Sequence, residues 1–122
     1  MAFNISNDGI IKLTRGDTVQ LPLFINKGTA MQPVRYELQD GDEVYLALMQ
    51  PNQYFEDAIL KKKFTKDNLN DHGDVLIRFE SEDTVQLIPG KYYYQIKAKF
   101  LNVEGNYDVN TLVERTQFII LE

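Results

Sequence analysis

Hydrophobic residues alternate with other residues in several short stretches of this sequence, and this period of two constrains the fold more than any other feature. The longest such stretch covers residues 92–100. Its apolar positions are Tyr92, Tyr94, Ile96, Ala98 and Phe100, and its intervening positions are Tyr93, Gln95, Lys97 and Lys99. Because successive side chains of a strand point to opposite faces, the pattern predicts a β-strand rather than a helix.

Six further stretches carry the same pattern with varying regularity: residues 10–14, 19–25, 44–49, 58–64, 75–79 and 116–121. Turn-forming residues separate them, as at Gly41, Gly73 and Gly90. Parallel strands would need crossover helices, for which the sequence has little room. The spacing predicts an all-β domain of about seven to eight antiparallel strands, in a sandwich or barrel. Helical turns are expected only within 50–57 and 65–72.

Length and charge set further limits. The 122 residues are enough for a single domain, 1–122, and the sequence has no cysteine for a disulfide or a thiolate metal site. The net charge of −5 argues against nucleic acid as a partner, because phosphate binding needs a cationic surface. The longest clean apolar run, Val44 to Met49, is far too short for a membrane helix. The first eight residues lack the pattern of a signal peptide, so a soluble protein made in a cytoplasm is expected.

No catalytic set or metal site is predicted. His72 is the only histidine, and the two serines, Ser6 and Ser81, do not lie in a Gly-x-Ser-x-Gly motif. A calcium loop counted from Asp67 fails, because its third position is a leucine and its sixth is His72. We therefore expect no enzymatic activity, no cofactor and no metal.

Two further patterns have more than one interpretation. Alternation turns Lys62 toward the same face as Leu60 and Phe64, which is typical of an edge strand that avoids aggregation. The alternative is that the run 61–63 is a basic binding site. The string Asp-Thr-Val-Gln-Leu occurs at 17–21 and at 83–87. We interpret it as two acidic turns that each lead into an apolar stretch, rather than as a duplication.

The segment 83–92 has the features of a tyrosine corner. Leu87 precedes the turn residue Gly90, and Tyr92 then opens the longest predicted strand. In a tyrosine corner, the tyrosine packs inward and its hydroxyl bonds to backbone a few residues upstream. We expect Tyr92, Leu87 and Ile96 to be buried; the alternative is a plain Pro-Gly turn.

The order of motifs along the chain resembles a known family. The motifs are Arg15-Gly16-Asp17-Thr18, Tyr36-Glu37-Leu38, Gly41-Asp42, Val44 to Leu48, Ile59 to Lys62, Val75 to Ile77, Asp83-Thr84, Leu87, Gly90 to Ile96, Thr111 to Arg115, and Phe118 to Ile120. In order and spacing they are similar, over about residues 10–121, to the N-terminal immunoglobulin-like domain of phage baseplate upper proteins and related prophage tail proteins. Members usually continue into a linker and further domains, whereas this sequence ends at Glu122.

The resemblance implies an immunoglobulin-like β-sandwich that anchors a receptor-binding apparatus by protein contacts, in the tail baseplate of a virion made in the cytoplasm of a bacterial host. It implies no catalytic residues. The expected partners are other tail proteins or copies of the chain itself, as a homo-oligomer. The alternative function is a carbohydrate-binding or adhesin-type module.

Alternation also indicates where a partner would bind. It turns Tyr45 and Met49 outward from one strand, and Phe24 lies on the corresponding face of an earlier strand. Apolar groups on an outer face are typical of protein interfaces. We therefore predict an interface at Tyr45, Met49 and Phe24. The alternatives are that a loop such as 26–40 covers these residues, or that the assignment of faces is reversed.

Overall fold

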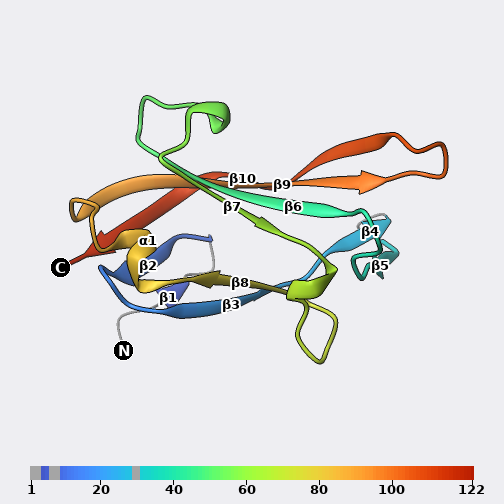
Figure 1. The fold of residues 1–122 in the computed structure, drawn as a ribbon, viewed down its shortest axis with the longest axis horizontal. Helices are drawn as coiled ribbons and strands as arrows, with labels where there is room; N and C mark the ends of the chain where they lie inside the picture. Colours follow the sequence, from blue (N-terminus) through green and yellow to red (C-terminus); the bar gives the residue numbers. More distant parts are fainter. Residues whose placement is uncertain (1–3, 6–8, 29–30) are drawn as a thin grey trace.

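The computed structural model describes residues 4–5, 9–28 and 31–122, and its regular structure is almost entirely β (Figure 1). The strands of these residues are β1 (Asn4–Ile5), β2 (Ile11–Thr14), β3 (Val19–Leu23), β4 (Asn26–Gly28), β5 (Pro33–Arg35), β6 (Glu43–Met49), β7 (Leu60–Phe64), β8 (Val75–Phe79), β9 (Gly90–Leu101) and β10 (Tyr107–Leu121). Helical structure in this part of the chain consists of α1 (Ser81–Thr84), η1 (Phe55–Asp57) and η2 (Lys66–Asn68). None of these helices is long and apolar enough to cross a membrane. The all-β class is confirmed.

Each of the seven stretches with alternating hydrophobicity overlaps a strand, and 116–121 is only the last part of β10. The strands that alternation did not predict are β1, β4 and β5, which have only two or three residues and are too short to show a period. The number of strands therefore exceeds the seven to eight expected. The turns η1 and η2 lie in the two ranges predicted for helical turns, whereas α1 was not predicted. A capping box between Glu80 and Asp83 supports its first turn.

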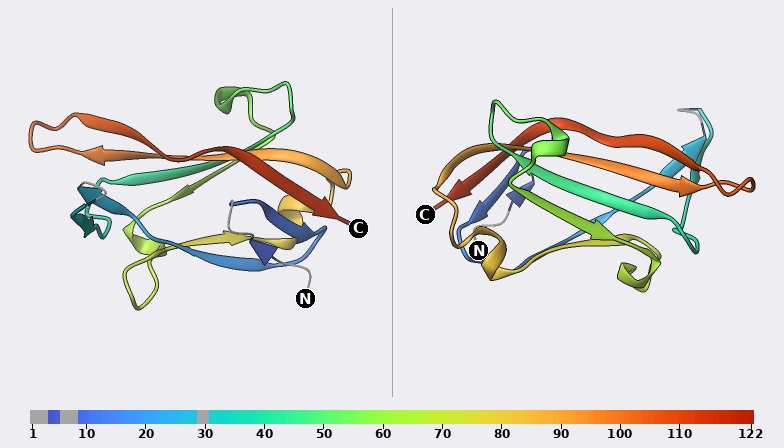
Figure 2. Two further views of the ribbon diagram at one scale, coloured as in Figure 1. Left: turned by 180° about the vertical axis from the view of Figure 1, so that it is seen from behind. Right: turned by 45° about the horizontal axis from the view of Figure 1, so that its top comes forward.

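The strands form two layers that face each other (Figures 1 and 2). The six-stranded sheet has the order β1-β2-β10-β9-β6-β7, and it curls so that β10, β9, β6 and β7 lie on one side of the core while β1 and β2 lie near the level of the pair β3-β8 (Figure 1). A third unit, the hairpin β4-β5, lies at one end of the molecule. Within the described residues β3 pairs only with β8, so Pro22 in β3 can face the open edge, where no backbone donor is needed.

One strand pair departs from the antiparallel arrangement that the sequence predicted. β2 runs parallel to β10, with Ile11 opposite Phe118 and Thr14 opposite Leu121. A parallel pair needs a long connection between its strands. Here nearly the whole domain lies between β2 and β10, so no crossover helix is required. The expectation of a wholly antiparallel domain is therefore wrong for this pair.

Phe118 holds the two layers together. It lies on β10, is fully buried, and its ring centroid is 5.3 Å from that of Phe79 on β8 in the opposite layer. The ring of Tyr94 on β9 lies edge-on to Phe118 at 6.1 Å. The core between the layers also includes Ile11, Leu13, Val44, Leu46, Leu48, Val75, Ile77, Ile96, Phe100 and Ile120.

Lys62 shows how the sheet ends. β7 is the last strand of the six-stranded sheet, as predicted for an edge strand. The side chain of Lys62 points between the layers, is 19 % exposed, and its Nζ lies 2.5 Å from Asp83 of α1. An inward charge is tolerated there because Asp83 neutralises it, and the ion pair ties β7 to the turn that follows β8.

Tyr92 makes the backbone hydrogen bond expected of a tyrosine corner. Its side chain is buried, and its hydroxyl donates to the carbonyl of Ile88 at 2.6 Å. Leu87 is partly buried against the core, and Ile96 is buried. Gly90, which begins β9, has a φ of 151°, a conformation that other residues rarely adopt. The corner fixes how the chain turns from the β3-β8 layer into β9.

Replacing Tyr92 with phenylalanine should lower the free energy of unfolding by about 1 kcal/mol, because the Ile88 carbonyl loses its donor while the ring stays in place. Chemical denaturation would measure the change. Tyr93→Phe is a matched control on the opposite face of the same strand, and it should change stability by less. Equal stability of the Tyr92→Phe variant and the unchanged chain would mean that the hydroxyl is satisfied by water instead.

Candidate interaction surfaces

At Ala47 and Met49 the outer face of β6 is covered, contrary to the prediction of an exposed interface there. Ala47 and Met49 are fully buried, and Tyr45 is partly buried with its hydroxyl donating to Glu43 at 2.7 Å. The loop 50–59 that joins β6 to β7 rises over this face of the sheet (Figure 1). The prediction that Met49 is available to a partner is therefore wrong. The loop above Met49 is 50–59 and not 26–40, whereas Tyr45 stays partly exposed between Lys63 and Lys97.

Arg115 of β10 holds the covering loop in place. Its guanidinium donates to three loop carbonyls, those of Gln50 (3.1 Å), Pro51 (2.9 Å) and Gln53 (2.8 Å). It also contacts the sulfur of Met49 at 3.4 Å, and it lies 4.8 Å from the ring centroid of Tyr93. One planar cation thus binds three backbone carbonyls of the loop, in addition to the loop's own hydrogen bond from the Gln53 backbone to the Gln50 carbonyl. The sequence contains no local sign of this role.

A shallow pocket of about 410 Å³ lies between this loop and the sheet. Its lining consists of Pro51, Asn52, Gln53, Tyr54 and Phe55 from the loop, Gln95 from β9 and Arg115 from β10. Tyr54 is 74 % exposed, so most of its side chain is open to solvent. The pocket therefore combines amide groups with an accessible aromatic ring.

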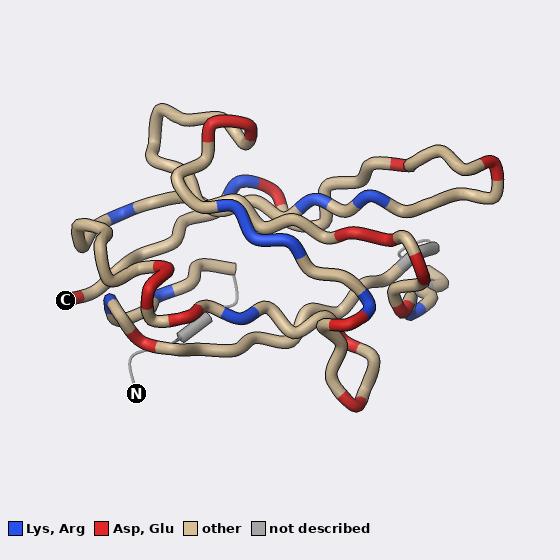
Figure 3. Tube along the Cα trace, viewed as in Figure 1, with Lys and Arg blue, Asp and Glu red and all other residues tan. Residues whose placement is uncertain are grey.

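The same outer face carries a basic cluster beside the loop. We call it the lysine face, and it comprises Lys61 and Lys63 of β7 and Lys97 and Lys99 of β9. The strand register places Tyr45 of β6 between Lys63 and Lys97. Figure 3 shows the basic segments of β7 and β9 close together on the upper sheet. The alternation in 92–100 predicts the direction of Lys97 and Lys99, but only the sheet order brings β7 beside them, across β6.

Aromatic rings hold three of these lysines. The ammonium groups of Lys61 and Lys97 lie 5.1 and 4.7 Å from the ring centroid of Phe55, and that of Lys99 lies 5.6 Å from the centroid of Tyr45. Lys63 instead pairs with Glu43 at 3.1 Å. Hydrogen bonds from Tyr45 and Lys63 lower the pKa of Glu43.

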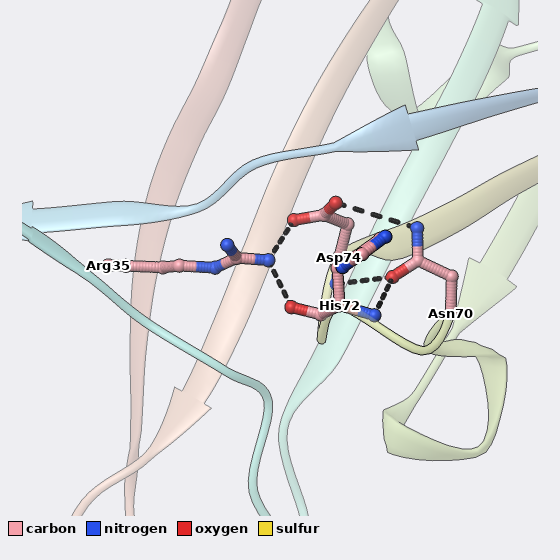
Figure 4. Close-up of polar contacts among 4 residues, drawn as sticks. All are labelled: Arg35, Asn70, His72 and Asp74. Atoms are coloured by element: carbon pink, nitrogen blue, oxygen red, sulfur yellow. Dashed lines mark hydrogen bonds and ion pairs between the residues drawn. The ribbon is translucent and has the colours of Figure 1, made fainter.

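Phe24 is the one predicted interface residue that is well exposed, at 60 %. The guanidinium of Arg35, on β5, lies 4.8 Å from its ring centroid. Figure 4 shows Arg35 reaching the turn 70–74, where it donates to the carboxylate of Asp74 at 2.5 Å and to the backbone carbonyl of His72. The Asn70 side chain accepts hydrogen bonds from the backbone of His72 and Asp74 and keeps this turn closed. Arg35 thus ties β5, and with it the hairpin β4-β5, to the turn before β8.

The acidic residues of the rejected calcium loop do not converge. Asp74 is committed to Arg35, whereas Asp67 and Asp71 are exposed. In the part of the chain that the structure describes, no three His, Asp or Glu side chains are grouped closely enough to hold a metal ion. Ser81 begins α1, and Ser6 lies outside the described residues.

Exposed apolar residues gather at one end of the molecule. The hairpin β4-β5 and the turn between β9 and β10 lie at the same end, opposite α1 (Figures 1 and 2). The exposed apolar residues there, which we call the apolar end, are Phe24, Met31, Val34, Leu101, Val103, Tyr107 and Val109. Val103 at the tip of the β9-β10 turn is completely exposed, and Met31 nearly so. Apolar side chains in such a setting are typical of a binding surface.

Asp42 fixes the base of this end. It is buried, and its carboxylate accepts hydrogen bonds from the Tyr36 hydroxyl, from the backbone of Gln39 (2.9 Å) and from the backbone of Leu101 at the end of β9 (2.9 Å). Gly41 has a φ of 88°, and a Cβ there would come within 2.6 Å of the Leu101 side chain. Burial, and then the hydrogen bond to Asp42, raise the pKa of Tyr36 to about 12.

Comparisons of the chain with protein-family models, with curated proteins and with solved structures found no match.

Proposed function

We propose that the chain is a non-enzymatic adaptor domain with an immunoglobulin-like fold, which joins structural proteins of a bacteriophage or prophage tail at the baseplate. It acts through protein–protein contacts, with other tail proteins or with copies of itself. The order of motifs from Arg15 to Ile120 supports the family, and an apolar end on a two-layer β domain supports a role in binding.

The strand order supports the immunoglobulin-like part of this proposal. In variable-type domains, strands G, F, C and C′ lie side by side in one sheet, and strands B and E pair in the other. The sequence β10-β9-β6-β7 in one layer and the pair β3-β8 in the other correspond to these two groups. The tyrosine corner of such domains lies between strands E and F, the position of Tyr92 in this chain.

The observation that carries the binding role is the apolar end. Two hairpins that are distant in sequence place apolar side chains at the same end of the molecule, and some of these side chains are almost wholly in water. Exposed apolar groups cost free energy in an isolated domain and gain it when a partner covers them. A hairpin tip with Val103 fits insertion between subunits better than it fits catalysis.

Assembly in the particle tests the proposal. The chain should be found by mass spectrometry at fixed stoichiometry in purified tailed particles of the encoding strain, and it should form a complex with tail proteins encoded beside it when they are produced together. The triple variant Val103→Ser, Tyr107→Ser, Val109→Ser should remain folded and lose that complex in size-exclusion chromatography.

The matched control removes exposed apolar groups from the opposite end, with Val85→Ser and Ile88→Ser. These changes should leave the complex intact. Particles that contain none of the chain would overturn the tail role. A complex that survives the triple variant would move the interface away from the apolar end.

The pocket beside Arg115 supports carbohydrate binding as a second candidate function. Sugar sites typically combine an exposed aromatic ring with a few polar groups placed to fix orientation. Tyr54 and the amides of Asn52, Gln53 and Gln95 offer this combination. A glycan array should then show binding that Tyr54→Ser abolishes, and an array without signal would leave the adaptor role alone.

A further inference from the structure

The lysine face concentrates positive charge on a chain whose net charge is −5. Its four lysines come from two strands with only β6 between them, and Glu43 is the acidic residue that pairs with one of them. Because these lysines contribute positive charge, the rest of the surface carries a net charge more negative than −5. The charge of the molecule is therefore polarised, and an anionic partner would be drawn to this face.

Three of these lysines form no direct ion pair in the part of the chain that the structure describes, although Glu43 lies opposite Lys99 in the strand register and Lys99 helps to lower its pKa. Among the described residues, no carboxylate lies within ion-pair distance of Lys61, Lys97 or Lys99, whereas Lys62, Lys63 and Lys66 on or next to β7 are all paired. Lys61 and Lys97 both lie over the ring of Phe55, so their ammonium groups are no more than about 10 Å apart and repel each other. An anion placed between them would relieve that repulsion.

The aromatic rings limit what kind of anion fits. Single-stranded nucleic acids bind to basic sheet faces by stacking bases on free aromatic rings. Here Lys61 and Lys97 already contact the ring of Phe55, and Lys99 that of Tyr45. The rings hold the lysines in place rather than offering a stacking surface. The net negative charge also opposes a densely charged polymer.

An extended acidic polypeptide fits better. Lys97 and Lys99 are two residues apart on β9, so they project from the same face about 7 Å from each other. Carboxylates on alternate residues of an extended segment repeat at the same distance. We propose that the lysine face binds an extended acidic segment of a partner protein, with Asp or Glu at alternate positions. This inference rests on the proposed role as a protein-binding domain and names the chemistry of one partner.

A synthetic peptide tests this directly. A ten-residue peptide of alternating Glu and Ser would be titrated into the isotope-labelled chain at low salt, with amide shifts followed by NMR. We expect shifts centred on β7, β6 and β9, and an affinity that falls as salt is raised. The double variant Lys61→Gln, Lys97→Gln should weaken binding by about fivefold, which is modest because exposed ion pairs contribute little each.

The matched control is Lys12→Gln, Lys91→Gln, which removes the same charge from exposed positions elsewhere on the chain. It should weaken binding by less than about twofold, because it removes only long-range attraction between the chain and the peptide. Equal losses in the two double variants would overturn the inference, as would an absence of binding at low salt. A ten-nucleotide oligothymidine that binds the same residues more tightly would also overturn it, in favour of nucleic acid.

The two proposals fail separately. If the chain binds the acidic peptide but is absent from tailed particles, only the proposed role in the tail is overturned. If the chain is found in particles, but neither assembly nor peptide binding changes in the Lys61→Gln, Lys97→Gln variant, only the proposal of a binding site at the lysine face is overturned.

Discussion

Replacing Phe118 with alanine is expected to lower the free energy of unfolding by about 3–5 kcal/mol, the largest single effect in this protein. Phe118 is fully buried and contacts Phe79 across the interface between the layers as well as Tyr94 beside it. Removal of its ring loses the transfer free energy of the side chain and leaves a cavity between two sheets that β-strand hydrogen bonds hold in place. Denaturant unfolding followed by fluorescence or circular dichroism would measure the loss.

Two variants serve as controls for this prediction. Phe118→Leu keeps most of the volume and should cost much less. Phe24→Ala removes the same ring from an exposed site and should change stability by well under 1 kcal/mol. Similar losses for Phe118→Ala and Phe24→Ala would contradict the packing of the two layers described above.

Replacing Asp42 with alanine should cost about 3 kcal/mol or more. The change removes a buried carboxylate, and the Tyr36 hydroxyl and the backbone donors of Gln39 and Leu101 lose their shared acceptor at a partly buried place. Asp40→Ala, two residues earlier, is the matched control. Its side chain is 88 % exposed and pairs only with Lys66, so its loss should cost less than 1 kcal/mol. If Asp42→Ala and Asp40→Ala unfold at the same temperature, the hydrogen bonds to Asp42 do not stabilise the fold as proposed.

The hydrogen bond from Tyr36 to Asp42 also makes the stability of the fold depend on pH in the alkaline range. The pKa of Tyr36 is about 12 in the folded chain, above the ordinary value of 10. Because the folded state keeps its proton more tightly, the contribution of Tyr36 to stability is complete below pH 10 and is lost as the pH rises through about 12. The Asp42→Asn variant should move the pKa of Tyr36 downward. The difference between phenolate absorbance titrations with and without Tyr36→Phe would isolate this one tyrosine.

Most of the strands could be predicted from the sequence, because the alternation of buried and exposed side chains depends only on local strand geometry and on one face being buried. β9 shows this most clearly, since its buried residues Tyr92, Tyr94, Ile96 and Ala98 are the ones the period selects. The pairing of β2 with β10 was not predictable in this way. It joins residues more than a hundred positions apart and depends on closure of the whole domain.

The candidate sites were less predictable than the strands. The outward direction of Met49 follows from the period of two, but whether an outward residue meets water depends on what lies above it. Here the loop 50–59 lies above Met49, and Arg115, more than sixty residues away, holds it there by binding the carbonyls of Gln50, Pro51 and Gln53. The lysine face likewise needs both β7 and β9, which only the order of strands in the sheet brings near each other.

The repeated string Asp-Thr-Val-Gln-Leu shows what the sequence determines locally and what the tertiary structure decides. At 17–21 its last three residues begin β3, and Val19 is buried against the core. At 83–87 its first two residues end α1, and Val85 is 46 % exposed. The second copy also touches the residue before the first, since the backbone of Gly16 donates to the Thr84 hydroxyl at 2.9 Å. Sequence by itself determined an all-β domain with a known set of inward-facing side chains, because burial imposes a local period. Only the tertiary structure decided which conformation each copy takes, because five residues gain too little free energy locally to outweigh the contacts that surround them.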